Sequence, residues 1–191
     1  MKSTKIPFLY FILLNLFNIT SYAVGAETEH RHALNEAHVH GEVVLKMVKD
    51  DSLLEIELIS PAANFTGFEH EAQNDEEVEA IEKTNDLLRQ YALIFTLPET
   101  SCNHSSTAID QSGLIEYENK ETPHDHDGNS EKSEHSEISA LYQYDCYGDL
   151  SWLKVNLFQF FPKVDRINLQ WVNRNGQGRD ILTAKQNTVE F

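Results

Sequence analysis

The sequence lacks the short motifs that mark common enzyme active sites. No GxSxG, HExxH or CxxC pattern occurs in its 191 residues, so the signatures of α/β-hydrolases, zinc proteases and dithiol oxidoreductases are missing. Serines and histidines lie close together only in polar tracts, where nothing would hold a catalytic triad in register. We therefore expect a protein that is not an enzyme. A secreted zinc hydrolase stays open as an alternative, because enough histidines and glutamates are present for three ligands and a base.

Basic residues are scarce. Lysine and arginine number 15 against 31 aspartates and glutamates, which gives a formal net charge of −16. Loss of Lys2 and Lys5 with a leader segment would change it to −16 − 2 = −18. Such acidity argues against nucleic acid and anionic membrane surfaces as partners and favours cations. Solubility alone is the competing explanation.

Long apolar runs are missing except near the N-terminus. Two lysines precede an apolar run over residues 6–17, and small residues follow at 24–26. This pattern is typical of a secretory signal peptide, which we predict over residues 1–26. A transmembrane anchor is the alternative, but the run is short for a membrane span. The rest of the chain, residues 27–191, is then expected to be a periplasmic domain without a membrane span.

Cysteine is nearly absent, with only Cys102 and Cys146. In an exported protein these two form the only available disulfide. Closing a loop of that length would stabilise the fold by about 4 kcal/mol in the chain-entropy model. A two-cysteine metal site is the alternative, and oxidation outside the cytoplasm disfavours it.

Alternating apolar residues are the main structural signal. Residues 43–47 and 54–58 alternate on either side of a polar break at 49–52, which predicts a β-hairpin. The same alternation predicts strands in three later segments: 138–146, 153–157 and 167–171. One segment, 75–91, has apolar residues at helical spacing and acidic residues in its first turn, which predicts a helix.

A weak internal repeat links the two halves of the domain. His40-Gly41-Glu42-Val43 parallels His135-Ser136-Glu137-Ile138, and each is followed by predicted strands. Chance likeness of short strands is the alternative. The predicted fold is mostly β, an antiparallel β-sandwich-like unit of two similar halves, about 38–118 and 135–191. It carries one helix and a disordered histidine-rich insertion at about 119–137.

Histidines at the start of each predicted half indicate an ordered metal site. Side chains two apart in a strand share a face, so His38, His40 and Glu42 would point together, as would His135 and Glu137. Packing of the halves about a pseudo-twofold axis would bring these faces together. The predicted ligands of this site are His38, His40, His70, His135 and Glu137. The alternative is that His38 and His70 only form hydrogen bonds at strand ends.

The polar segment over residues 121–137 predicts a second and looser class of metal site. Its sequence, ETPHDHDGNSEKSEHSE, has almost no apolar residue and is rich in histidine and acid. The predicted ligands are His124, Asp125, His126 and His104. Ordering such a loop costs conformational entropy, so these sites should bind more weakly. An ordinary hydrophilic insertion is the alternative.

Several sequence blocks resemble one protein family. They are HVHG at 38–41, LEIELISPAANFTGFEH at 54–70, Cys102 and the YDC that ends at Cys146, LFQFFP at 157–162 and LQWVNRNGQG at 169–178. Together they resemble the ZrgA-type periplasmic zinc-binding proteins of Gram-negative bacteria. The resemblance implies Zn²⁺ as the bound metal and a role in zinc uptake with an ABC transporter. Ligand spacing alone would also allow nickel, cobalt or copper, and a metal buffer or chaperone tied to no transporter is the alternative function.

Overall fold

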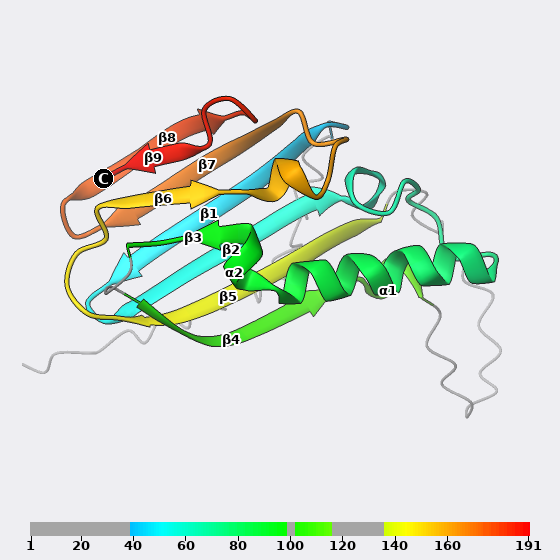
Figure 1. Ribbon diagram of the computed structural model, residues 1–191, viewed down its shortest axis with the longest axis horizontal. Coiled ribbons are helices and arrows are strands. Elements are labelled where there is room, and N and C mark those ends of the chain that lie inside the picture. Colours follow the sequence, from blue (N-terminus) through cyan, green and yellow to red (C-terminus); the bar gives the residue numbers. More distant parts are fainter. Residues whose placement is uncertain (1–38, 99–101, 116–135) are drawn as a thin grey trace, which may run out of the picture. The chain divides into compact units, whose positions relative to one another are not determined.

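Strands are the main regular structure of the computed structural model, which describes residues 39–98, 102–115 and 136–191. The predicted signal peptide and nearly all of the predicted histidine-rich insertion lie outside these residues. The helices are α1 (Asp75–Arg89) and α2 (Tyr91–Ile94), and single 3₁₀ turns lie at Ala62–Asn64, Ser112–Leu114 and Leu157–Gln159. The strands are β1 (Glu42–Asp50), β2 (Leu53–Pro61), β3 (Phe95–Thr96), β4 (Cys102–Asp110), β5 (Glu137–Cys146), β6 (Trp152–Val155), β7 (Arg166–Asn173), β8 (Gly176–Leu182) and β9 (Thr188–Glu190) (Figure 1).

The described strands form two sheets. The larger one has the order β4-β5-β2-β1-β7-β8 and the smaller one the order β3-β6-β9. The prediction of a mostly-β, mainly antiparallel fold with one main helix is confirmed. One described pair differs, because β1 and β7 run parallel, with Glu42 beside Arg166 and Val48 beside Val172. The chain passes through the small sheet between β5 and β7, so β7 enters the large sheet at the same end as β1.

The predicted first hairpin is confirmed as β1–β2. Its apolar residues at odd positions of β1, such as Val43 and Leu45, are fully buried, while Lys46 and Val48 between them are exposed. A two-residue turn joins the strands, and Asp51 in it has a φ of 41°. Aspartate tolerates this left-handed conformation, and short hairpin turns require it.

The strands that follow the second half of the sequence repeat do not form a hairpin like β1–β2. β5 pairs with β2 and β4 in the large sheet, whereas β6 pairs with β3 and β9 in the small one. Residues 147–151 carry the chain from one sheet to the other, with Gly148 at a φ of 82°. The likeness between the two sequence segments therefore does not extend to the pairing of the strands that follow them.

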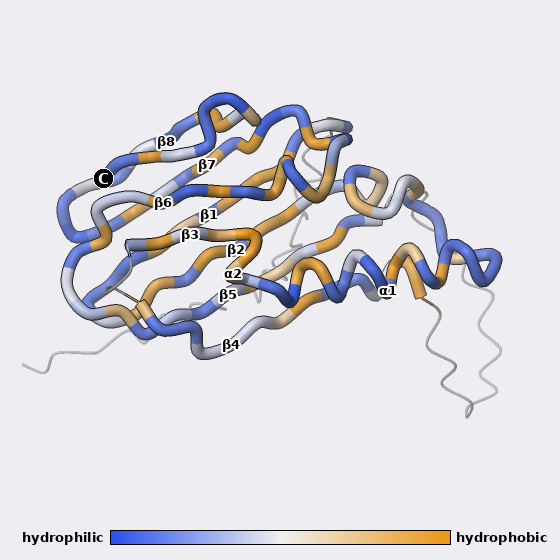
Figure 2. The backbone as a smooth tube through the Cα atoms, viewed as in Figure 1, coloured by the Kyte–Doolittle hydropathy of each residue, from blue (hydrophilic) through white to orange (hydrophobic). Residues whose placement is uncertain are grey.

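Helix α1 packs on the face of the large sheet that carries the buried residues. Ile81 and Leu88 of α1 are fully buried, and the Tyr142 hydroxyl of β5 donates to the Leu88 carbonyl at 2.9 Å. Hydrophobic residues recur along α1 and along the strands (Figure 2). The predicted helix is thus confirmed, although it ends at Arg89 rather than Tyr91. No helix among the described residues is long and apolar enough to cross a membrane.

The predicted Cys102–Cys146 disulfide is present. The two cysteines face each other in the register between β4 and β5. β4 lies at the edge of the large sheet and pairs only with β5. The bond therefore fixes the start of an edge strand to its single neighbour.

His104 lies beside this disulfide in an aromatic cluster. Its ring stacks on Tyr91 with centroids 3.6 Å apart, and Tyr144 meets it edge-on at 5.4 Å. The His104 Nε2 lies 2.7 Å from the Thr107 hydroxyl. Burial lowers the pKa of His104 below its usual value, and a hydrogen bond with the Ser106 backbone opposes this shift in part.

Reducing the disulfide should lower the melting temperature in the absence of metal. The cysteines are 44 residues apart in sequence, and releasing a loop of this length costs about 4 kcal/mol in the chain-entropy model. Calorimetric melting with and without reductant measures the effect. A double Cys102→Ser, Cys146→Ser variant is the control, and its melting temperature should not respond to reductant. An unchanged melting temperature in protein with two titrated free thiols would contradict this expectation.

Lowering the pH should destabilise the fold through His104. Its pKa is lower in the folded than in the unfolded chain, so the unfolded chain binds the extra proton as the pH falls through about 6.5, and stability falls with it. A His104→Phe variant keeps an aromatic ring on Tyr91 but cannot titrate. Urea melts across about pH 7.5 to 5.5 should show a smaller loss of stability in this variant than in the wild type. Equal losses in the two proteins would show that His104 does not contribute.

Candidate metal site

One end of the large sheet gathers several of the predicted ligands. β1 and β7 begin there with Glu42 beside Arg166, and β2 ends there with Pro61 beside Glu137, the first residue of β5. The turn that carries His40 precedes β1, and the loop that carries Glu69 and His70 follows β2. The sheet register therefore brings together segments that are more than a hundred residues apart in sequence.

A buried asparagine fixes the backbone next to His40. The Asn64 side chain is 3% exposed, and its Oδ1 accepts a hydrogen bond from the Gly41 backbone at 2.8 Å. Its Nδ2 donates to the Glu42 carbonyl at 2.9 Å and to the Ser60 hydroxyl at 3.0 Å. One amide side chain thus joins the start of β1 to the end of β2.

Gly41 is required where it stands. Its φ is 84°, and a Cβ atom added there would lie 2.6 Å from a carboxylate oxygen of Asp165. Its carbonyl accepts hydrogen bonds from the backbone of Asp165 at 2.8 Å and of Arg166 at 3.1 Å. The left-handed backbone at Gly41 turns the chain just before β1 begins. Residues 39–42 are therefore not the continuous strand that the sequence predicts.

Glu42 accordingly does not join His40. Its carboxylate forms an ion pair with Arg166 and accepts a hydrogen bond from the Asn168 amide at 2.8 Å, both on β7. The predicted shared strand face is thus wrong for His40 and Glu42, and His38 lies outside the described residues. The physical reason is the turn at Gly41, which breaks the alternation of side chains.

The partner of His40 is Glu69. The His40 Nε2 lies 2.9 Å from the Glu69 Oε1. The His40 side chain is 69% exposed and that of Glu69 is 9% exposed. An exposed imidazole held by a buried carboxylate is a common arrangement around protein metal ions, where the carboxylate fixes the ring of a ligating histidine.

The start of β5 lies next to the same glutamate. The Ser136 backbone N–H donates to the Glu69 carbonyl at 3.2 Å, and the Ser136 carbonyl accepts from Ala62 at 2.9 Å. The Ser136 hydroxyl donates to the Gly113 carbonyl at 2.9 Å. His135, the residue before Ser136, lies outside the described residues, as do His38, His124, Asp125 and His126.

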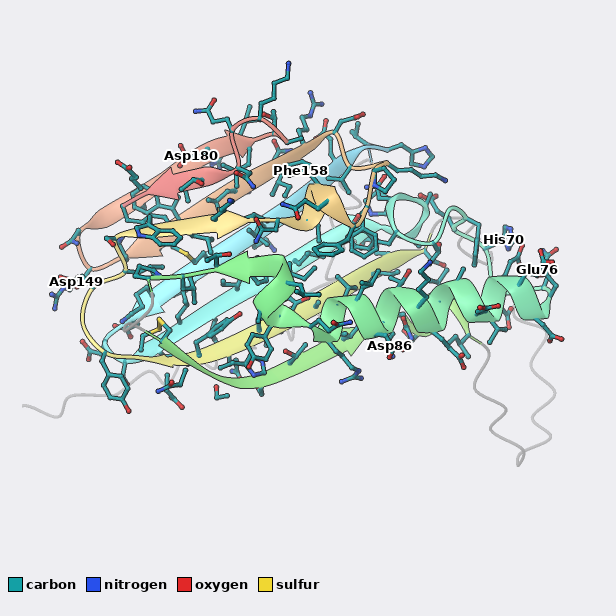
Figure 3. The ribbon with its side chains drawn as sticks, in the orientation of Figure 1. His70, Glu76, Asp86, Asp149, Phe158 and Asp180 are labelled. Carbon is teal, nitrogen blue, oxygen red and sulfur yellow. A yellow bond between two sulfur atoms is a disulfide. The ribbon has the colours of Figure 1, made fainter. Side chains whose placement is uncertain are left out.

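His70 has contacts of its own at the start of α1, and Figure 3 labels it there beside Glu76. Its ring stacks on Phe68 with centroids 5.0 Å apart, and its Nδ1 donates to the Glu71 carbonyl at 2.9 Å. Its Nε2 lies 3.9 Å from a carboxylate oxygen of Glu77. His70 thus lies next to Glu69 in sequence, but its ring faces α1.

The remaining described candidates lie elsewhere. Glu137 is exposed on the first residue of β5. His104 is paired with Tyr144, seven residues further along β5, so it is about 23 Å from Glu137 along the strand. Within the described residues, no group of three or more histidine, cysteine, aspartate or glutamate side chains is arranged to hold a metal.

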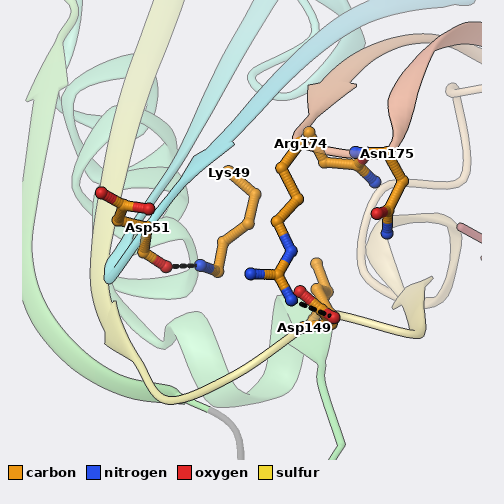
Figure 4. Close-up of a pocket in the computed structure, with 7 residues that line it drawn as sticks. Lys49, Asp51, Asp149, Arg174 and Asn175 are labelled. Atoms are coloured by element: carbon orange, nitrogen blue, oxygen red, sulfur yellow. Dashed lines mark hydrogen bonds and ion pairs between the residues drawn. The ribbon is translucent and has the colours of Figure 1, made fainter.

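A small pocket at the opposite end of the sheet does not suit a metal cation (Figure 4). Its lining comprises Lys49, Asp51, Asp149, Leu150, Asn173, Arg174 and Asn175. The Arg174 guanidinium pairs with Asp149 at 2.6 Å, and the Lys49 ammonium donates to the Asp51 carbonyl. Two cationic side chains in so small a space repel a divalent ion.

Comparison with known proteins agrees with the sequence resemblance. No curated protein sequence matches the chain significantly. A family model described as the ZrgA family zinc uptake protein matches residues 37–191. This match includes the turn with His40, the Asn64 to His70 loop, both cysteines and every described strand. The chain therefore belongs to the ZrgA family of zinc uptake proteins.

Proposed function

We propose that this protein binds Zn²⁺ in the periplasm and captures or delivers it during zinc uptake with an ABC-type transporter. Membership of the zinc uptake family supports the metal and the process. The N-terminal sequence pattern and the disulfide support a location outside the cytoplasm, where disulfides persist. The formal charge of −16 favours the approach of cations.

The observation that carries the proposal is the His40–Glu69 contact next to the start of β5. We propose that zinc binds here through His40 and His135, with His38, His70 and Glu137 as further candidate donors. His38 is two residues from His40, and His135 precedes the anchored Ser136. Zinc needs four donors at about 2.0–2.1 Å, and water supplies any that the protein does not.

The histidine-rich insertion is proposed as a second and weaker class of site, formed by His124, Asp125 and His126. The sequence predicts a polar loop without regular structure, and the conformational entropy lost on ordering such a loop would reduce the affinity. We leave His104 out of this class. Its ring stacks on Tyr91 and meets Tyr144 edge-on, and its Nε2 already lies 2.7 Å from the Thr107 hydroxyl.

Two variants should separate the two classes. Replacing His40 and His135 with alanine should abolish the tightest zinc binding, because it removes the proposed central donors. Deleting residues 122–134 should lower the stoichiometry and leave the tightest binding intact. Isothermal titration of each purified protein with Zn²⁺ measures both quantities, and melting without metal checks that each variant is folded. The reverse outcome, with the tightest site lost on deletion and kept in the double variant, would disprove the central site.

Growth under zinc limitation should separate uptake from buffering. A strain without this protein should grow poorly in chelated medium and recover when zinc is added or when the wild-type protein is restored. The His40→Ala, His135→Ala variant should not restore growth. Normal growth under chelation combined with sensitivity to excess zinc would instead indicate a metal buffer. Ester or peptide hydrolysis that disappears on replacing one glutamate would indicate the hydrolase alternative.

A further inference from the structure

Glu69 is held more firmly than the histidine it contacts. Its side chain is 9% exposed, and its carbonyl accepts a hydrogen bond from Ser136. The loop before it is closed by the Thr66 hydroxyl, which lies 3.0 Å from the Ala62 carbonyl and 2.8 Å from the Phe68 carbonyl. The carboxylate is thus a fixed group to which the exposed ring of His40 is attached.

The contact defines which ring nitrogen of His40 carries the hydrogen. The 2.9 Å between Nε2 and the Glu69 Oε1 is a hydrogen-bond distance. A carboxylate has acceptor oxygens and no hydrogen to donate, so Nε2 is the donor in this contact. In this tautomer Nδ1 holds the free lone pair. No hydrogen bond to a described residue occupies Nδ1.

We propose that Glu69 is a positioning residue that keeps the hydrogen of His40 on Nε2, so that His40 binds metal through Nδ1. This inference rests on the proposed function, since it takes Zn²⁺ as the metal at His40. The carboxylate fixes the rotation of the ring and makes the other nitrogen a stronger donor. It does so from a buried position, while the ring itself remains 69% exposed to an arriving ion.

Direct ligation by both groups is the competing arrangement. Two donors on a tetrahedral zinc ion are about 3.3 Å apart at bond lengths of about 2.0–2.1 Å. The His40 Nε2 and Glu69 Oε1 are closer than this, at 2.9 Å. Placing a metal between them would require the two side chains to move apart. The hydrogen-bonded arrangement requires no such movement.

Nitrogen NMR of the full mature chain tests the assignment directly. Histidines are labelled with ¹⁵N, and the His40 signals are identified by their loss in a His40→Gln variant. After one equivalent of Zn²⁺, we expect the metal-dependent shift on His40 Nδ1, with Nε2 retaining the shift of a protonated nitrogen. A metal-bound Nε2 with hydrogen on Nδ1 would overturn the proposal and favour direct ligation.

A matched pair of glutamate variants tests the effect on affinity. Glu69→Gln keeps an oxygen that can accept from Nε2 but removes the charge, and we expect the tightest zinc binding to weaken by roughly 10- to 100-fold. Glu76→Gln removes the same charge from an exposed position at the start of α1, and we expect less than about a threefold change. Equal effects of the two changes would overturn the positioning role.

The outcomes also separate this inference from the proposed function. A His40→Ala variant that keeps the tightest site would disprove the proposed site itself. Loss of that site in His40→Ala together with unchanged affinity in Glu69→Gln would disprove only the role of Glu69. Melting of each variant without metal shows whether the fold is intact, and the nitrogen shifts of Glu69→Gln distinguish lost orientation from lost folding. We expect its His40 ring to populate both tautomers.

Discussion

The position of the site depends on one buried amide group. The Asn64 side chain bonds to the backbone of Gly41 and Glu42 and to the Ser60 hydroxyl, so it connects the start of β1 with the end of β2. Each buried polar group left without a hydrogen bond would lower the stability of the fold by about 1–3 kcal/mol. The hydrogen bonds of Asn64 therefore strongly favour this one arrangement of the two strand ends. The Gly41 carbonyl accepts two backbone hydrogen bonds, from Asp165 and from Arg166 at the start of β7. The turn carrying His40 is therefore held by elements on both sides of β1.

Local periodicity predicts the elements that are themselves local. The β1–β2 hairpin, helix α1 and strands β5, β6 and β7 all follow from alternating or helical spacing, and the disulfide follows from having only two cysteines. The parallel pairing of β1 with β7 does not follow, because it joins segments more than a hundred residues apart. β4 is missed for another reason: its sequence, CNHSSTAID, has too few apolar residues to alternate clearly. As an edge strand packed on one side, it needs few of them.

The described parts of two segments that carry predicted ligands lie close together, but not through the strand face that the alternation predicts. The sequence expected the segments beginning at His38 and His135 to converge, and the described parts of both, His40 and Ser136, do meet at Glu69. The alternation predicts a shared strand face as the cause, but Gly41 is left-handed and β1 begins only after it, at Glu42. The contact of His40 with Glu69 joins a turn to a loop, and hydrophobic periodicity predicts only contacts within helices and strands. Its one sequence signal was the FTGFEH block, where Gly67 between two phenylalanines indicates a packed loop.

The division of exposure between His40 and Glu69 suits a protein that must both take up and release its ion. A fully buried ligand would hold metal behind a barrier of local unfolding, because water and recipient could reach it only when the fold opened. A fully exposed ligand would lose rotational freedom on binding and would bind weakly for that reason. Here the side chain of the proposed ligand is 69% exposed, whereas the group that orients it is 9% exposed. In the proposed site, the folded end of the sheet would orient His40 in advance and leave it open to exchange on the solvent side, which is the combination that rapid transfer of a tightly bound ion requires.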